Sequence, residues 1–241
     1  MITFVYTEAA MLGSGVPITP RPVRASERAY RQLRGEILDG VLGPGTGLLE
    51  VEQAERIGVS RTPLRAAVAR LIADGLVMGR NGRGFEVTAL SIDSITGLYE
   101  LREGLEVHAV SLAAERRDVA TFANLRLKFL AAPALLLQGD DGIRRYYELI
   151  DEFEAAVDAA VANPFLYSAL VSVRTHLARI RRLARGNQDR LRAAAAEHLL
   201  IIDAIIAGDS SLAAHATHVH LHQSLTNVLA TLAEDAATPV D

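Results

Sequence analysis

The 241-residue sequence contains no cysteine. This absence excludes a disulfide framework, a thiolate metal site and a cysteine nucleophile, and it suits a protein of the reducing cytoplasm. No uninterrupted apolar run reaches the roughly 20 residues that a membrane-spanning helix needs. The start of the chain lacks a basic region and includes Glu8, so it does not match a secretory signal. We therefore expect a cytoplasmic protein with no membrane partner.

The chain as a whole has no excess of positive charge, because its formal net charge is −4. Its two parts differ, however. Residues 21–90 hold 11 arginines and 8 acidic residues, a balance of +3, whereas residues 91–241 hold 14 basic and 20 acidic residues, a balance of −6. A basic module joined to an acidic one indicates that any nucleic acid would bind the N-terminal part. A balance of +3 is too small to drive tight nonspecific binding.

Turn signals divide residues 23–90 into three short helices and a hairpin. Apolar residues recur at helical spacing over residues 26–39, a second helix over residues 50–57 ends at a glycine, and Ser60 is a suitable N-cap for a third helix. Two short strands then flank a turn at residues 80–84. This order predicts a winged helix-turn-helix, preceded by a flexible arm at residues 1–22.

The third helix begins with residues suited to DNA. Arg61 and Arg65 can pair with guanine edges in a major groove, while Ser60, Thr62 and the helix N–H groups can hold phosphate. Arg83 lies at the tip of the hairpin, where it can reach an adjacent groove. We expect residues 23–90 to bind a double-stranded DNA operator.

The segments QLRGEILDGVLGPGTGLLE, AERIGVSRTPLRAAVARLIADGLV and NGRGFEV together resemble the DNA-binding domain of the GntR family of bacterial transcription regulators. The resemblance implies that Arg34, Arg61, Thr62 and Arg65 contact the operator. It also implies that Gly84 lets the wing approach the minor groove. The chain departs from the family at residues 47–49, where a serine or arginine usually contacts phosphate.

Residues 91–236 carry helical patterns almost throughout. Six helices are expected, at 91–117, 119–138, 143–162, 164–185, 190–207 and 210–235, and their short connections favour an antiparallel bundle. The fold class is therefore mainly α, with a winged helix-turn-helix followed by an all-helical domain. The segments LREGLEVHAVSLAAERR, EFEAAVDAAVANPFL and EHLLIIDAIIAGDSSLAAHATHVHL resemble the FCD effector domain of the FadR-type subfamily. That resemblance implies binding of a small effector and dimerisation.

Three polar residues, Glu154, His198 and His220, interrupt apolar helical stripes. One glutamate and two histidines suffice for a zinc-like divalent cation with open positions, although each alone is explained as a hydrogen-bonded core residue. Metal-binding FCD domains usually have an aspartate and a histidine four residues apart on the third helix, where this chain has Ile150 and Glu154. Two alternatives stay open: a divalent metal held by the three residues, or a metal-free pocket in which they bind the effector directly.

Arg102 lies beside the apolar stripe of the first helix in the C-terminal domain. Its spacing allows an ion pair with Glu106 one turn later. The family resemblance implies instead that this arginine faces the cavity and binds an effector carboxylate, a task that suits a planar guanidinium. Further pocket candidates are Tyr99, Tyr146, Tyr147 and Asn163; core packing is the alternative for the tyrosines and helix capping for the asparagine.

These observations predict a homodimeric transcription regulator, a repressor, that a small organic acid releases from a pseudo-palindromic operator. One alternative is a regulator whose effector domain has lost metal or ligand sensing, because Ile150 replaces a metal-ligating residue. A more remote alternative is a metal-dependent enzyme that uses Glu154 and the two histidines.

Overall fold

A computed structural model describes residues 24–80, 84–183 and 187–237. The predicted arm at residues 1–22 and the wing residue Arg83 lie outside this part of the chain. The elements, in chain order, are α1 (Ala25–Leu38), β1 (Gly47–Leu48), α2 (Glu50–Ile57), α3 (Arg61–Ala73), β2 (Val77–Gly79), β3 (Phe85–Val87), α4 (Ile92–Arg116), α5 (Val119–Leu136), α6 (Gly139–Val161), α7 (Pro164–Leu183), α8 (Gln188–Ala207) and α9 (Ser210–Ala237).

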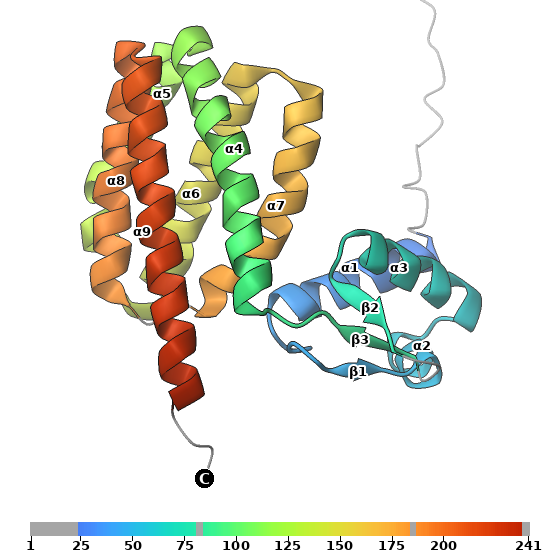
Figure 1. The fold of residues 1–241 in the computed structure, drawn as a ribbon. Helices are drawn as coiled ribbons and strands as arrows, with labels where there is room; N and C mark the ends of the chain where they lie inside the picture. The colour runs from blue at the N-terminus through green and yellow to red at the C-terminus, as the bar shows by residue number, and fades with distance from the viewer. Residues whose placement is uncertain (1–23, 81–83, 184–186, 238–241) are drawn as a thin grey trace, which may run out of the picture.

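The N-terminal domain is a three-helix cluster with a small antiparallel sheet (Figure 1). Apolar residues on one side of each element form the core of this domain. Leu33 of α1, Leu64 and Leu71 of α3, and Val87 of β3 are all at most 1% exposed. The sheet order is β1-β3-β2, with Leu48 opposite Phe85. The predicted winged helix-turn-helix is thus confirmed, and β1 is a third strand that the sequence patterns did not indicate.

Helices α4 to α9 form the C-terminal bundle (Figure 1). Its core includes Phe129 and Tyr146, whose rings meet edge-on at a centroid distance of 6.4 Å. Helix α5 is the one helix in the described segments that is long and apolar enough, by length and composition, to cross a membrane. Its buried residues, among them Phe122, Leu125 and Phe129, form part of the bundle core, and the helix packs against α6 and α8. Pro133 lies inside α5, and the helix continues past it to Leu136, close to the predicted end at residue 138.

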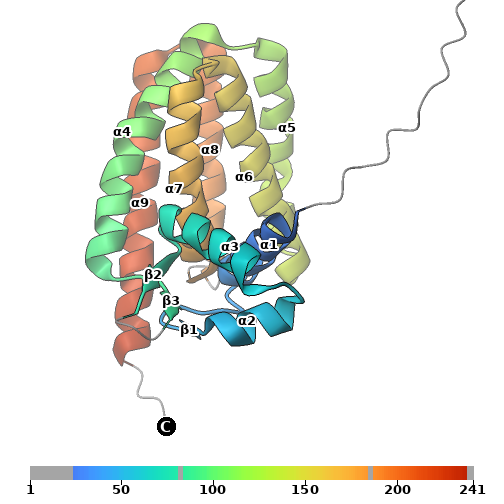
Figure 2. The same ribbon diagram turned by 90° about the vertical axis from the view of Figure 1, so that its right-hand side faces the viewer.

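The two domains meet along α7, which lies behind α1 and α3 in the view of Figure 2. Arg34 of α1 donates from Nη2 to Thr175 Oγ1 of α7 at 3.0 Å. Arg179 of α7 donates to the carbonyl oxygen of Thr88, which directly follows β3. The DNA-facing role predicted for Arg34 therefore differs from its position here, because its guanidinium contacts the C-terminal domain.

Candidate ligand cavity and nucleic-acid interface

The start of α3 is an exposed surface with two arginines. Arg61 and Arg65 both reach Glu50 at the first turn of α2, with Nη2–Oε2 and Nε–Oε1 distances of 3.5 and 3.0 Å. Thr62 beside them is exposed. Ser60 occupies the N-cap position as predicted, but its side chain accepts no cap hydrogen bond. An exposed hydroxyl and two arginines at a helix N-terminus are suited to phosphate and base contacts.

The wing depends on Gly84 for a reason that the sequence did not indicate. Gly84 has a φ of +96°, and a Cβ at this position would lie 2.8 Å from the carbonyl oxygen of Leu48. Its own carbonyl accepts the N–H of Arg80 at 3.0 Å. The glycine therefore allows β1 and the hairpin to approach closely, which fixes the base of the wing.

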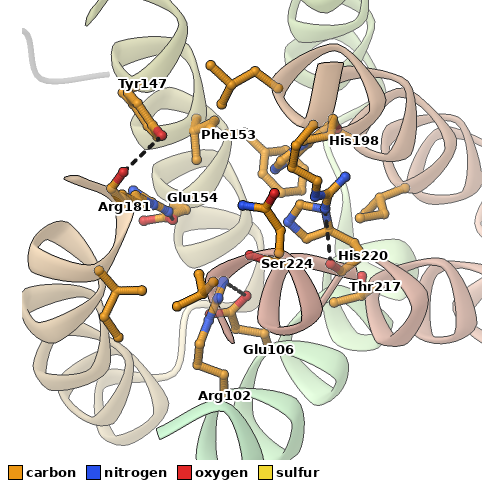
Figure 3. Close-up of a pocket in the computed structure, with 18 of the residues that line it drawn as sticks. Arg102, Glu106, Tyr147, Phe153, Glu154, Arg181, His198, Thr217, His220 and Ser224 are labelled. Atoms are coloured by element: carbon orange, nitrogen blue, oxygen red, sulfur yellow. Dashed lines mark hydrogen bonds and ion pairs between the residues drawn. The ribbon is translucent and has the colours of Figure 1, made fainter. Parts of the chain in front are cut away.

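A cavity of the C-terminal domain lies between α4, α6, α7, α8 and α9 and has a volume of about 100 Å³. Every arginine and glutamate that lines it belongs to one of three arginine–glutamate pairs, two of which are labelled in Figure 3. The pairs are Arg102 with Glu106, Arg181 with Glu154, and Arg190 with Glu197. Each guanidinium keeps N–H groups beyond those used by its glutamate, so each can donate to a ligand.

Arg102 forms the predicted ion pair with Glu106 and also faces the cavity, while its binding of an effector carboxylate stays a prediction. It pairs with Glu106 at 2.8 Å between Nε and Oε1, and it lines the cavity with 5% of its surface exposed. Burial opposes ionisation of Glu106, but Arg102 outweighs it and holds the pKa of that carboxyl below its usual value. The guanidinium also lies 4.7 Å from the Tyr99 ring centroid, so its orientation is fixed from two sides.

Glu154 lies at the cavity wall, where its carboxylate forms ion pairs with two arginines of α7. Arg181 Nη2 is 2.6 Å from one oxygen and Arg174 Nε is 2.9 Å from the other. Arg174 also pairs with Asp158. The side chain of Glu154 therefore belongs to an ion-pair network that fastens α6 to α7.

The two histidines lie together, with ring centroids 4.5 Å apart. His198 Nδ1 is 2.7 Å from the carbonyl oxygen of Ala194, and His220 Nδ1 is 2.6 Å from Glu197 Oε2. A carbonyl only accepts, so Nδ1 of His198 carries the proton. Burial lowers the pKa of both rings; the neighbouring His220 adds to this for His198, whereas Glu197 opposes it for His220.

The predicted metal set does not fit this arrangement. Within the described residues, no group of three or more histidine, cysteine or acidic side chains is placed to hold a metal ion. Each histidine has the Nδ1 hydrogen bond that metal-binding histidines typically have. Ile150, however, has no atom that can bind a metal, and both carboxylate oxygens of Glu154 are paired with arginines. A third ligand is therefore missing.

Two buried hydroxyls at this cavity have no hydrogen-bond partner. Tyr146 Oη and Thr217 Oγ1 are the buried side-chain polar atoms without a partner in the described part of the chain, and both residues line the cavity. Burial raises the pKa of Tyr146, so its hydroxyl stays protonated. A ligand with oxygen acceptors would satisfy both groups.

The remaining pocket candidates divide between the cavity and a helix cap. Tyr99 and Tyr147 line the cavity; the hydroxyl of Tyr99 is 2.9 Å from Ser224 Oγ, and that of Tyr147 is 3.5 Å from the carbonyl oxygen of Arg181. Asn163 does not line it. Its Oδ1 accepts the N–H groups of Phe165 and Leu166 at the start of α7, which confirms helix capping.

Sequence reasoning missed Arg181, and it missed Arg190 with its partner Glu197. For Arg190 and Glu197 a signal was present, because residues seven apart lie on the same face of a helix. Which acid each arginine meets depends on how α6, α7, α8 and α9 pack, and helical spacing alone does not give that.

Comparisons with known proteins agree with both halves of this description. The family model described as FCD domain matches residues 97–223, and that of bacterial regulatory proteins, gntR family, matches residues 25–87. An HTH-type transcriptional regulator of Streptomyces ambofaciens is 29% identical over 80% of this chain and 80% of its own length. The HTH-type transcriptional repressor RspR of Escherichia coli is 25% identical over 82% of this chain and 86% of its own. The structure of E. coli McbR/YncC has a TM-score of 0.68 at 21% identity, covering 87% of this chain and 99% of that one.

Proposed function

Because the chain belongs to the GntR family of bacterial regulatory proteins and carries an FCD domain, we propose that this DNA-binding regulator is a homodimeric repressor controlled by a small organic carboxylate. The carboxylate binds the cavity between α4, α6, α7, α8 and α9 without a metal ion. The protein acts in the cytoplasm on a double-stranded operator, and ligand binding releases it.

One observation carries the ligand site. The unpartnered hydroxyls of Tyr146 and Thr217 both line one cavity. A buried polar group without a hydrogen bond costs about 1–3 kcal/mol, so two of them in one place are costly for an empty structural core. A ligand with acceptor oxygens removes that cost.

The charges around the cavity favour a carboxylate. Arg102, Arg181 and Arg190 already have glutamate partners, so the arginines stay ionised and oriented before a ligand arrives. A carboxylate can take their remaining N–H groups in the paired geometry that guanidinium favours. Since these side chains come from α4, α7 and α8, the ligand links three helices.

The alternatives receive less support. The metal-dependent forms, whether effector site or enzyme, require Glu154 to leave two arginines. A domain that has lost ligand sensing does not explain why two buried hydroxyls lack hydrogen-bond partners. The metal-free ligand site accounts for Ile150, for the arginine pairs and for the hydroxyls together.

The DNA contacts proposed are Ser60, Arg61, Thr62 and Arg65 of the exposed α3 start, with Arg83 and Gly84 at the wing. In a homodimer the two α3 helices read two half-sites, so the spacing between protomers decides affinity. A carboxylate that binds one spacing better than the other shifts the population toward it.

The test uses the full chain and fluorescence anisotropy with labelled DNA from upstream of its own gene. We expect specific binding that unlabelled specific DNA displaces, binding that Arg61→Ala weakens, and release by one member of a panel of C2–C8 carboxylates. Arg102→Met should bind DNA normally and fail to respond to that carboxylate, whereas the surface variant Arg126→Met should respond as the natural chain does. Absence of any specific DNA binding by folded, dimeric protein would overturn the proposal; specific binding that no carboxylate releases would overturn its effector part.

A further inference from the structure

A second cavity lies where the two domains meet. It has a volume of about 280 Å³. Gly75 and Thr88 line it from the N-terminal domain, the first turns of α4 line it from one side, and His176 and Arg179 of α7 line it from the other. None of these residues lines the cavity that holds Arg102, apart from their neighbour Ile180, which borders both.

Arg179 is a buried cation without an acidic partner among the described residues. It is 5% exposed, and its one hydrogen bond goes to the carbonyl oxygen of Thr88. Burial lowers the pKa of its guanidinium, and no carboxylate opposes that effect. Arg102 is the instructive comparison, because it is equally buried but has the Glu106 carboxylate at 2.8 Å. A buried charge without a counter-ion is costly, so a site at Arg179 favours an anion.

His176 lies one turn before Arg179 on the same helix, and both line the junction cavity. Burial lowers the pKa of its imidazole, and the nearby Arg179 lowers it further. The one acidic residue that acts on His176 is Asp74, whose backbone bonds the ring and whose Oδ2 accepts the Tyr30 hydroxyl at 2.6 Å. The charged groups facing the imidazole are thus Arg179 and Asp74.

We propose that the junction cavity is a second ligand site, which binds a small organic monocarboxylate through Arg179 and lays its short apolar chain against Leu98 and Leu101. The apolar part of the wall includes Leu98 and Leu101 of α4, and the volume is just below the range usual for drug-sized ligands, so a chain of about four or five carbons fits. The proposal does not depend on the effector site at Arg102.

The occupant would touch both domains. Thr88 belongs to the segment that follows β3, whereas Arg179 and Leu98 belong to the bundle. A ligand held by both sides stabilises the present orientation of the DNA-binding domain relative to the bundle. It therefore changes DNA affinity through domain orientation, separately from the first cavity.

The test titrates the full-length protein with sodium butyrate and follows the His176 ring by NMR. The His176 resonance is assigned with His176→Gln, and total ionic strength is held constant with sodium chloride. We expect a saturable change in the His176 signal together with a rise of its pKa, because an anion beside the imidazole favours the charged ring. 1-Butanol, which has the same chain without the charge, should leave the signal unchanged.

Two variants remove the site in different ways. Arg179→Met should weaken butyrate binding at least about tenfold, since it removes a charged hydrogen bond. Gly97→Leu keeps Arg179 but places a side chain at the cavity wall, where a Cβ meets no atom within 4 Å, and it should also abolish binding. Its matched control is Gly104→Leu, the same change on the same helix away from this cavity, which should bind butyrate normally.

Arg102→Met separates the two sites, because it should keep the response of His176. A response that persists in Gly97→Leu, or that fails to saturate in the natural chain, would overturn the proposal. If Arg179→Met does not fold, Gly97→Leu and its control still decide the result. Loss of the response in Arg102→Met would also overturn it, since the signal would then come from the first cavity.

Discussion

Glu50 of α2 holds Arg65 of α3 with 3.0 Å between Oε1 and Nε, and it also lies 3.5 Å from Arg61. The two arginines expected to meet DNA thus already share an intramolecular anion. If these arginines bind DNA, its phosphates must replace that anion, so we expect Glu50 to lower DNA affinity. An exposed pair of this kind contributes about 0.2–1 kcal/mol.

Replacement of Glu50 by glutamine should tighten DNA binding about threefold at low salt. The reason is that neither arginine then has to break an ion pair with a carboxylate before it binds DNA. Anisotropy titrations with operator DNA at two salt concentrations measure the change, and the gain should shrink at the higher salt. Glu52→Gln, on the exposed side of the same helix, is the matched control. Weaker binding by Glu50→Gln would mean that Glu50 positions the arginines for DNA.

Removal of either unpartnered cavity hydroxyl is expected to raise the free energy of unfolding. Tyr146→Phe and Thr217→Val each remove a buried hydroxyl without a partner, so each should stabilise the ligand-free protein by about 1 kcal/mol. The same changes should weaken binding of the releasing carboxylate about tenfold. Urea unfolding and calorimetric titration measure the two effects.

Tyr99→Phe is the control for that pair, since its hydroxyl is bonded to Ser224 at 2.9 Å. This variant should destabilise the protein by about 1 kcal/mol. If Tyr146→Phe destabilised the protein to the same extent, the hydroxyl of Tyr146 would have a partner in solution and the argument from unpartnered groups would fail.

The absence of a third metal ligand can be tested by introducing the missing ligands. After dialysis against a chelator and then zinc, the natural chain should keep less than one zinc ion per chain, because a third ligand is missing. Ile150→Asp combined with Glu154→His should restore binding beside His198 and His220 and raise the melting temperature in zinc. Elemental analysis measures the stoichiometry, and Ile150→Asp alone is the control. One tightly held zinc per natural chain would disprove the metal-free site.

Stability should fall as the pH drops below about 6.5, the ordinary pKa of histidine. The pKa values of His198, His220 and His176 are all lowered in the folded chain, mainly by burial. Below pH 6.5 the unfolded chain takes up protons that the folded chain refuses, which favours unfolding until the lowered pKa values are reached.

Urea unfolding in chelator at pH 7.0 and 5.5 measures this loss. His198→Asn should reduce it by about 1 kcal/mol, the contribution of one buried histidine over one pH unit. Glu197, whose pKa is lowered by its His220 and Arg190 hydrogen bonds despite burial, loses its contribution only below about pH 4.5, outside this window. An identical pH dependence in His198→Asn would show that this imidazole titrates normally.

Much of the fold follows from local patterns in the sequence. Helix α2 begins and ends at the predicted residues, and the breaks near Pro164 and Gly208 are where turn chemistry placed them. Helix α6 begins four residues earlier than expected, at Gly139. The reason is tertiary: a Cβ on Gly142 would lie 1.8 Å from the carbonyl oxygen of Leu135, so this glycine lets the helix start against the end of α5.

The candidate site was predictable only in part, for a similar reason. His198 and His220 interrupt apolar stripes, and a stripe is visible within one helix. The bond between Glu154 and Arg181 spans two helices, and its distance depends on how α6 and α7 pack. The sequence therefore indicated that Glu154, His198 and His220 face the interior, while the packing brought the guanidinium groups of α7 to Glu154.

Helix α7 presents Thr175 to the DNA-binding domain and Arg181 to the first cavity. Six residues separate them, about 9 Å along a helix axis. The angle between the directions of these two side chains about the helix axis is therefore fixed by a rigid segment shorter than two turns. One residue inserted between them would turn one surface about 100° away from the other, so the two contacts together depend on the length of this segment.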